Sequence, residues 1–283
     1  MELLSLVLPL RPLEMPAERQ EIPRWWGRAV QALFLRVVRE RNPELAQELH
    51  DEGGLHPYSV SSLMGSFGRD GSLKTDEIYW LRLSGFRADV CQAVWEAAQP
   101  GGSLAAGARI ELDYTCFEVQ AVAEGGERFS PWQSRMSYAQ LGMPFLLASQ
   151  APPRRVRLMF TSPTTFKSEN RHVPLPLPKL VFGSLLERWN AFAPLAFVPE
   201  TRRYIEACLM VSRYELKTQS VKLKDGGTRV GMTGWVDFGT TNYDRYWMSI
   251  IATLGRFALF SGVGAGTGQG LGQCRMAEDV SPA

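Results

Sequence analysis

Residues 77–99 read EIYWLRLSGFRADVCQAVWEAAQ, in which a strand pattern runs directly into a helix pattern. The first half is rich in residues that favour a strand, among them Ile78, Tyr79, Trp80 and Phe86. In the second half Val90, Val94 and Ala97 fall on one side of a helix, and Pro-Gly-Gly at 100–102 ends it. The neighbouring segments therefore decide which fold this strand–helix unit belongs to.

The flanking segments complete a recognisable order of elements. We predict a strand over Leu3–Leu10, a helix from about Pro23, a short helix capped by Asn42 and ending near His50, a strand at 58–63, and a strand at 108–122 (ARIELDYTCFEVQAV). Leaving out the short capped helix, the order is strand, helix, strand, strand, helix, strand. This is the ferredoxin-like arrangement.

The second part of the chain repeats this plan with different residues. We predict strands at 154–163, 203–223 and 228–238, helices at 179–192 and 243–260, and a short last strand near 271–276. The sequence thus predicts an α+β protein of two tandem ferredoxin-like (RRM-like) βαββαβ domains, residues 1–130 and residues 131–283, with the join somewhere in 125–150.

Charge is divided unevenly between the two parts. Residues 1–150 carry 14 Lys+Arg and 19 Asp+Glu, a net of −5, whereas residues 151–283 carry 17 and 10, a net of +7, and the two sum to +2. Such asymmetry favours a polyanion facing the second part, with unevenly shared surface charge as the alternative.

Cysteine spacing and the N-terminus narrow the class of protein. The four cysteines, at 91, 116, 208 and 274, include no CxxC pair, so neither a zinc site nor a disulfide framework is indicated. We expect no metal and no cofactor. The first ten residues lack a basic region, and no run approaches the ~20 apolar residues of a membrane helix, so we expect a reduced, cytoplasmic compartment and no membrane partner.

Near the end of the chain, SGVGAGTGQGLGQCR (261–275) has glycine at every second position from Gly262 to Gly272. A nucleotide-binding loop would need the GxxxxGK[ST] lysine and a following helix, and both are missing. A disordered tail is disfavoured because Leu271 and Cys274 indicate that a packed strand resumes. Close backbone approach, with N–H groups against phosphates or another backbone, fits the basic half of the chain.

Three collinear stretches resemble the CRISPR repeat-processing endoribonucleases of the RAMP superfamily. GVGAGTGQGLG (262–272) resembles their glycine-rich loop, FTSPTTFKSENRHVPLPLPKLVFGSLLERWNAF (160–192) their centre, and NPELAQELHDEGGLHPYSVSSLMG (42–65) their N-terminal helix, histidine and strand. The resemblance implies the tandem ferredoxin-like fold and metal-independent cleavage of CRISPR repeat RNA. In that reaction the 2′-hydroxyl attacks its phosphate, leaving a 2′,3′-cyclic phosphate and a 5′-hydroxyl and yielding guide crRNAs.

The resemblance places His50 at the catalytic position, and His56 six residues later is the candidate second group. Histidine suits acid or base work because its pKa is ~6.5. The end of a helix favours protonated His50 by roughly 0.3–1 kcal/mol, which leans towards the acid role and leaves the base role open. The alternatives are that His50 only caps helix carbonyls and that His56, before Pro57, belongs to a turn.

The chain departs from the family pattern in two respects. Certain relatives carry a tyrosine on the first helix, whereas LFLRVV (33–38) has none, and we expect strand alternation to aim Tyr58 away from His56. Family loops often carry a lysine or arginine, but none occurs from 262 to 272; Arg256 and Arg275 are candidate substitutes.

We expect RNA to be held by backbone groups of the loop and by cations of the second part. The predicted RNA-binding residues are Gly262, Gly264, Gly266, Gly268, Gly270, Gly272, Lys167, Arg171, Lys217, Lys222, Lys224 and Arg229. For the cations, a solvated sheet edge is the alternative. His172 is expected in a loop or against RNA, without a catalytic role, and Trp25, Trp26 and Trp247 either stack bases or pack in the core.

The expected partners are CRISPR repeat RNA and crRNA, and effector-complex subunits are candidates, for a monomer or homodimer. An alternative function is a non-catalytic RNA-binding subunit that holds crRNA in a larger complex. The two histidines argue for the enzyme, and the missing tyrosine and loop cation argue for the subunit.

Overall fold

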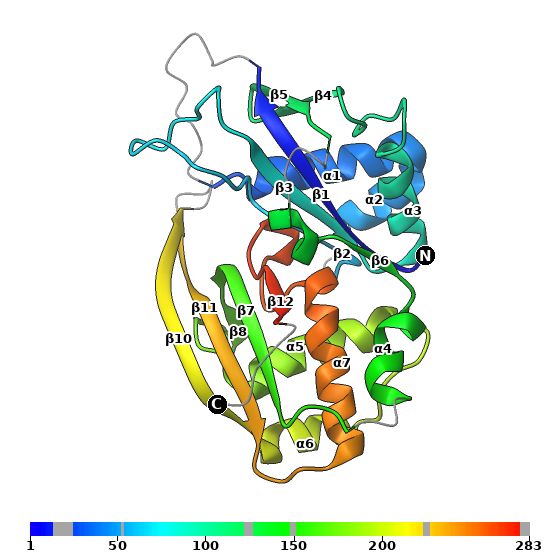
Figure 1. Ribbon diagram of the computed structural model, residues 1–283, viewed down its shortest axis with the longest axis vertical. Helices are drawn as coiled ribbons and strands as arrows, with labels where there is room; N and C mark the ends of the chain where they lie inside the picture. Colours follow the sequence, from blue (N-terminus) through cyan, green and yellow to red (C-terminus); the bar gives the residue numbers. More distant parts are fainter. Residues whose placement is uncertain (14–24, 52–53, 122–126, 148–150, 223–226, 278–283) are drawn as a thin grey trace. The chain divides into compact units, whose positions relative to one another are not determined.

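A computed structural model describes residues 1–13, 25–51, 54–121, 127–147, 151–222 and 227–277 (Figure 1). The chain divides into two compact units. Unit 1 comprises residues 1–135 together with 268–270, and unit 2 comprises residues 136–267 and 271–283. Three residues of the glycine stretch are thus counted with unit 1, although they lie more than 130 positions beyond the rest of it in the sequence.

Unit 1 is a ferredoxin-like fold with one extra helix. Its elements are β1 (Leu3–Pro12), α1 (Gly27–Arg41), α2 (Pro43–Asp51), β2 (Tyr58–Val60), β3 (Tyr79–Gly85), α3 (Ala88–Ala97), β4 (Arg109–Leu112), β5 (Thr115–Val119) and a 3-10 helix over Glu127–Trp132. The antiparallel sheet has the order β2-β3-β1-β5-β4, and β6 (Ser134–Met136) also pairs with β1. The extra helix is α2, which carries His50 in its last turn.

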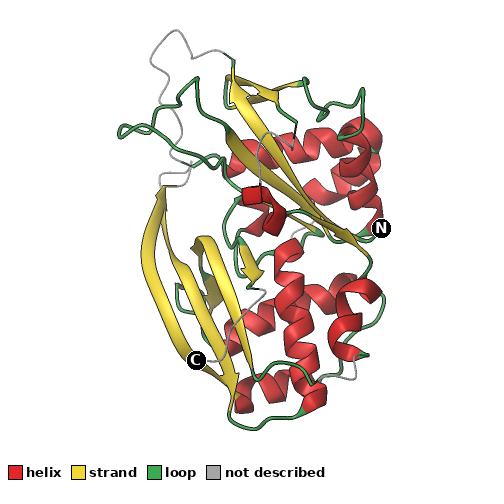
Figure 2. Cartoon of the chain, viewed as in Figure 1, coloured by secondary structure: helices red, strands yellow, loops and turns green. Residues whose placement is uncertain are grey.

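Unit 2 repeats the arrangement. Its elements are α4 (Tyr138–Leu146), β7 (Arg155–Thr164), β8 (Phe166–Ser168), β9 (Arg171–Val173), α5 (Pro178–Phe192), α6 (Glu200–Cys208), β10 (Leu209–Lys222), β11 (Thr228–Thr240), α7 (Arg245–Ser261) and β12 (Cys274–Met276). The sheet order β10-β11-β7-β12 is again ferredoxin-like, with the strands labelled in Figure 1 and drawn in yellow in Figure 2. The predicted fold class, two tandem ferredoxin-like domains, is confirmed.

Helical periodicity places the apolar faces as predicted. In α3 the side chains of Val90, Val94 and Ala97 are buried, and α1 buries the face that includes Leu33 and Phe34. Burial of such faces against a sheet stabilises the helices far more than intrinsic propensity does. Among the helices described, none has the length and apolar character to cross a bilayer.

Two predicted strands are wrong in part. The strand predicted over 203–223 begins only at Leu209, because residues 200–208 form α6, which buries Thr201, Tyr204 and Ile205 at helical spacing. The single strand predicted over 108–122 is the hairpin β4–β5, with Leu112 paired to Thr115 across a tight turn. The β-rich composition of both segments hid these breaks.

Candidate functional site

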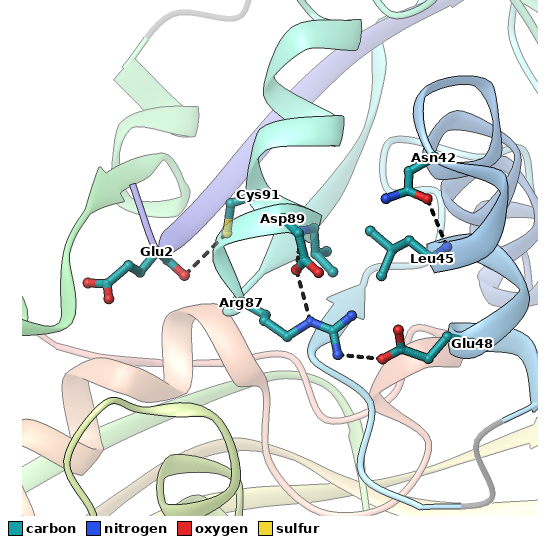
Figure 3. Close-up of polar contacts among 8 residues, drawn as sticks. Glu2, Asn42, Leu45, Glu48, Arg87, Asp89 and Cys91 are labelled. Carbon is teal, nitrogen blue, oxygen red and sulfur yellow. Dashed lines mark hydrogen bonds and ion pairs between the residues drawn. The ribbon is translucent and has the colours of Figure 1, made fainter.

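Helix α2 is fixed at its start by the predicted cap. The Asn42 side-chain oxygen accepts a hydrogen bond from the Leu45 amide at 3.0 Å (Figure 3). Leu45, Ala46 and Leu49 are buried and form the packed side of the helix. His50 follows Leu49 directly and lies in the exposed last turn of α2.

Arg87 ties the end of α2 to the start of α3. Its Nη1 lies 2.7 Å from Glu48 Oε1, and its Nε lies 2.8 Å from Asp89 Oδ1 (Figure 3). Partial burial opposes the charged form of Arg87, but its hydrogen bonds to the two carboxylates outweigh burial and raise its pKa. This fork holds the α2 turn that carries His50 against α3.

His50 is paired with Asp51, which the sequence analysis missed. His50 Nδ1 lies 3.1 Å from Asp51 Oδ1, and the His50 side chain is 66% exposed. A hydrogen bond from Gln47 and then one from His50 lower the pKa of Asp51, so the carboxylate is ionised at neutral pH. With Nδ1–H donated to Asp51, His50 Nε2 is the nitrogen left to exchange a proton with a substrate. The sequence shows a carboxylate directly after the histidine, but adjacency on a helix does not by itself indicate a contact.

His56 lies next to Tyr58, contrary to the expectation that strand alternation would separate them. Their ring centroids are 5.4 Å apart, because residues two apart share one face of an extended chain. Tyr58 is buried, stacks on Phe34 at 4.4 Å and accepts a hydrogen bond from Gln31 Nε2 at 3.0 Å. Burial raises the pKa of Tyr58, so its phenol is neutral at physiological pH. The predicted pairing of His50 with His56 stays a prediction.

Residues 268–270 of the glycine stretch, which belong to unit 1, lie next to Trp25, Ser61 and Tyr58. Trp25 Nε1 donates to the Gln269 carbonyl at 2.8 Å, and Gly270 forms a parallel bridge with Ser61. A Cβ added to Gly268 would lie 3.3 Å from the Tyr58 ring. The chain at 268–270 therefore lies against the aromatic neighbour of His56.

Trp25 and Trp26 both serve the fold. Trp25 holds the glycine stretch through its indole N–H, and Trp26 is buried and meets Phe117 edge-on with ring centroids 6.1 Å apart. Trp247 is half-buried, with its ring centroid 5.8 Å from that of Tyr204. The tryptophans were expected either to stack RNA bases or to pack in the core, and Trp26 packs in the core.

In unit 2 the glycine stretch is shaped by close packing of backbone. Five of its six glycines have positive φ, and a Cβ at Gly272 (φ +67°) would lie 2.0 Å from the Val263 carbonyl oxygen. Gly264 N donates to Ser184 Oγ at 3.0 Å and Gly272 N to the Pro163 carbonyl at 3.1 Å. Gly262 N likewise donates to Ala258. Of the two alternatives for these N–H groups, phosphates or another backbone, the second describes Gly262 and Gly272, while the Gly264 amide donates to a side chain. RNA binding by the stretch stays a prediction.

Cations lie close together in unit 2, and one of them lies beside the stretch. Strands β8 and β9 place Lys167 opposite His172, and the charges of Arg229 and Lys167 act on His172. Burial is the main cause that lowers the pKa of His172, and the two cations lower it further. Arg229 Nη1 lies 3.4 Å from the position of a Cβ on Gly266. We name Lys167, His172 and Arg229 the basic cluster.

The remaining predicted cations lie on exposed strands. Arg171 is exposed in β9, opposite Ser168, and Lys217 and Lys222 are exposed along β10. Lys224 lies outside the described residues. Within the described ranges, no group of three His, Cys, Asp or Glu side chains is placed to hold a metal ion.

Residues 158–274 match a protein-family model described as CRISPR-associated endoribonuclease Cas6. The curated Cas6 endoribonucleases of two Mycobacterium tuberculosis strains, CDC 1551 / Oshkosh and ATCC 25618 / H37Rv, are each 32% identical to this chain over 124 residues. That match covers 44% of this chain and spans only 39% of the length of these relatives.

Solved structures extend the likeness to nearly the whole chain. One Cas6 product complex matches with a TM-score of 0.74 and 27% identity, covering 98% of this chain and 99% of that one. A second matches with a TM-score of 0.73 and 26% identity, over 97% of this chain and 100% of that one. Thermus thermophilus Cas6, at 24% identity and a TM-score of 0.68 over 98% of each chain, shares the fold. The resemblance inferred from three motifs is confirmed.

Proposed function

We propose that this chain, which has the fold of the Cas6 CRISPR repeat-processing endoribonucleases, cleaves CRISPR repeat RNA without a metal ion and so produces guide crRNAs. The observation that carries the proposal is the likeness to a Cas6 product complex over 98% of the chain at 27% identity. The local chemistry at His50 supports it independently. The RNA partner would be the repeat transcript before the cut and the crRNA after it.

The reaction requires two proton transfers at one phosphodiester. The 2′-oxygen forms a bond to phosphorus as its proton passes to a base, and the P–O5′ bond breaks as an acid protonates the leaving 5′-oxygen. The products are a 2′,3′-cyclic phosphate and a 5′-hydroxyl. His50 can perform one transfer through Nε2 while Asp51 accepts the Nδ1–H and fixes the tautomer. We assign the second transfer to His56.

The first helix lacks the tyrosine that certain relatives carry, but Tyr58 lies beside His56. A neutral phenol on a buried ring beside His56 can pack against the histidine and hold its orientation. This contact weakens one argument for the alternative function, a non-catalytic subunit that holds crRNA. The other argument for the subunit is that the glycine stretch contains no lysine or arginine.

The test is cleavage of end-labelled CRISPR repeat RNAs in EDTA by the wild-type protein, His50→Ala and Glu44→Gln. Glu44→Gln is the matched control, since it changes an exposed side chain in the first turn of the same helix, outside the proposed catalytic and RNA-binding residues. We expect one defined cut that EDTA leaves intact, that His50→Ala reduces at least ~10²-fold, and that Glu44→Gln retains. Tight binding without a cut by any protein would favour the crRNA-holding subunit. Neither binding nor cleavage would overturn the proposal.

A further inference from the structure

Helix α5 buries a charged residue where an apolar one would be expected. Arg188 is 7% exposed and lies on the face of α5 that also buries Leu185 and Trp189. Removing a guanidinium from water is unfavourable unless its charge is compensated. The contacts of Arg188 indicate what it does there.

The Arg188 guanidinium holds the glycine stretch from inside unit 2. Its Nη2 donates to the Gly264 carbonyl at 2.7 Å and lies 3.4 Å from Thr267 Oγ1. Its Nη1 donates to the Ser184 carbonyl at 3.3 Å and to the Ser184 hydroxyl, which in turn accepts from the Gly264 amide. Arg188 and Ser184 together fix both polar groups of the Gly264 backbone.

These partners are all neutral oxygens, so they satisfy hydrogen bonds without neutralising the charge. The acidic residue whose charge acts on Arg188 is Glu187, and its carboxylate is bound at 3.0 Å by Arg202 at the surface. Burial lowers the pKa of Arg188 to about 10, against a smaller opposing effect of Glu187. Arg188 therefore stays protonated at neutral pH, as a buried cation whose hydrogen-bond partners in the described part of the chain are uncharged.

The backbone above Arg188 is only half-buried at Gly264, Ala265 and Gly266, although the amides of Gly264 and Ala265 donate within the chain, to Ser184 Oγ and to the Thr165 carbonyl. The stretch from 262 to 272 itself contains no lysine or arginine. Of the two candidate substitutes, Arg256 lies over the ring of Phe145 at 5.7 Å from its centroid. A charge beneath a thin layer of backbone is screened less than one in water, so it acts on a phosphate at the surface.

We propose that Arg188 is a buried cation beneath the glycine-rich stretch, holding Gly264 in place and, together with Arg229 beside Gly266, supplying the positive charge that attracts an RNA phosphate to the half-buried backbone at 264–266. The proposal rests on the RNA-cleaving function proposed above. Arg188 acts on RNA through the backbone that it supports, as a positioning residue, and it replaces from below the side-chain cation that the stretch lacks.

The test compares Arg188→Lys with Arg188→Gln. Both lose the guanidinium fork, but only lysine retains the charge. The probe is a CRISPR repeat RNA with a 2′-deoxy residue at the mapped cut, so that binding is measured without cleavage. We expect Arg188→Lys to bind within about threefold of wild type and Arg188→Gln at least about tenfold more weakly. Equal weakening by both variants would reduce Arg188 to a structural role and overturn the proposal.

A second pair of variants keeps the test valid if Arg188→Gln fails to fold. Ser184→Asp places a carboxylate against Arg188, and Ser184→Asn is its uncharged match. We expect Ser184→Asp to raise the midpoint of thermal unfolding relative to Ser184→Asn and to weaken RNA binding at least about tenfold. Equal RNA affinity of the two would contradict the proposal. If the wild-type protein binds and cuts repeat RNA but Ser184→Asp and Ser184→Asn bind RNA with equal affinity, only the role of Arg188 is wrong. If the wild-type protein neither binds nor cuts repeat RNA, the proposed function is wrong.

Discussion

At the scale of single residues, the candidate site depends on which neighbours the two histidines acquire. His50 could be placed from the sequence because the Asn42 cap and the apolar spacing of the short helix locate its last turn. Asp51 could not be assigned as its partner, since adjacent side chains on a helix do not face each other by default. Tyr58 was predicted wrongly, because alternation was applied to a pair two residues apart, which shares a face.

The His50–Asp51 pair predicts the effect of Asp51→Asn. Asparagine keeps the shape but can turn its NH₂ group, a donor, towards Nδ1, so the Nδ1–H tautomer of His50 is no longer fixed. We expect about a tenfold fall in the single-turnover cleavage rate, part of the ~10²–10⁴-fold that a general acid or base contributes. RNA affinity should be unchanged. Glu44→Gln, an exposed carboxylate in the first turn of the same helix, is the control and should cleave like wild type.

The basic cluster predicts that RNA binding is linked to pH through His172. The pKa of His172 is lowered by burial and then by Arg229 and Lys167, so the ring is neutral at pH 7. In the free protein this lowered pKa makes stability fall as the pH drops below about 6.5. An RNA phosphate favours the protonated ring, so we expect affinity to rise between pH 7.5 and about pH 5.5. The affinity of His172→Gln should rise less over that range; identical pH dependence would contradict the assignment.

At the scale of elements, apolar periodicity alone is enough to predict a helix that buries one face. The helices α1 and α3 follow their apolar spacing, whereas α6 and the β4–β5 turn lie within β-rich composition that conceals a change of conformation. The glycine stretch was recognised as a site of close backbone approach. The sequence could not reveal that most of that approach is to the chain itself, since this depends on contacts with residues about 80 to 110 positions away.

This packing predicts that Gly272→Ala is strongly destabilising. The left-handed backbone costs an alanine about 1–2 kcal/mol, and its Cβ would lie 2.0 Å from the Val263 carbonyl, which is backbone and cannot turn away. We expect a loss of at least about 3 kcal/mol in the free energy of unfolding, measured with urea. Gly101→Ala is the control, because Gly101 has φ +83° with nothing within 4 Å of its Cβ position. A similar loss in both variants would show that the contact with Val263 has no effect.

At the scale of the whole molecule, the uneven charge and the tandem fold are both visible in the sequence. The +7 net charge of residues 151–283 comes from many cations, and in unit 2 the structure groups Lys167 and Arg229 around His172, with Arg229 also beside Gly266. The fold class was predictable because element order repeats. The grouping of cations was not, because β9 and β11 are far apart in the chain.

If the predicted cations of unit 2 each contact a phosphate, RNA binding should weaken steeply as the salt concentration rises. For single-stranded RNA each neutralised phosphate contributes about 0.7 to the slope of log affinity against log salt concentration. We expect Lys222→Ala to lower the slope by about that amount and to weaken binding at every salt concentration tested. Arg203→Ala removes an exposed cation of α6 outside the predicted set and should leave the slope unchanged. Equal effects of both would indicate that net charge alone governs binding.

The most direct test of the central claim is single-turnover cleavage of a repeat RNA that carries one 2′-deoxy nucleotide at the mapped cut, in EDTA. We predict that this RNA binds with the affinity of the unmodified repeat and is not cut, because it lacks the attacking oxygen. The unmodified RNA should yield a 2′,3′-cyclic phosphate end and a 5′-hydroxyl end. Cleavage of the deoxy substrate at the same position would mean that water is the nucleophile, and would contradict the account.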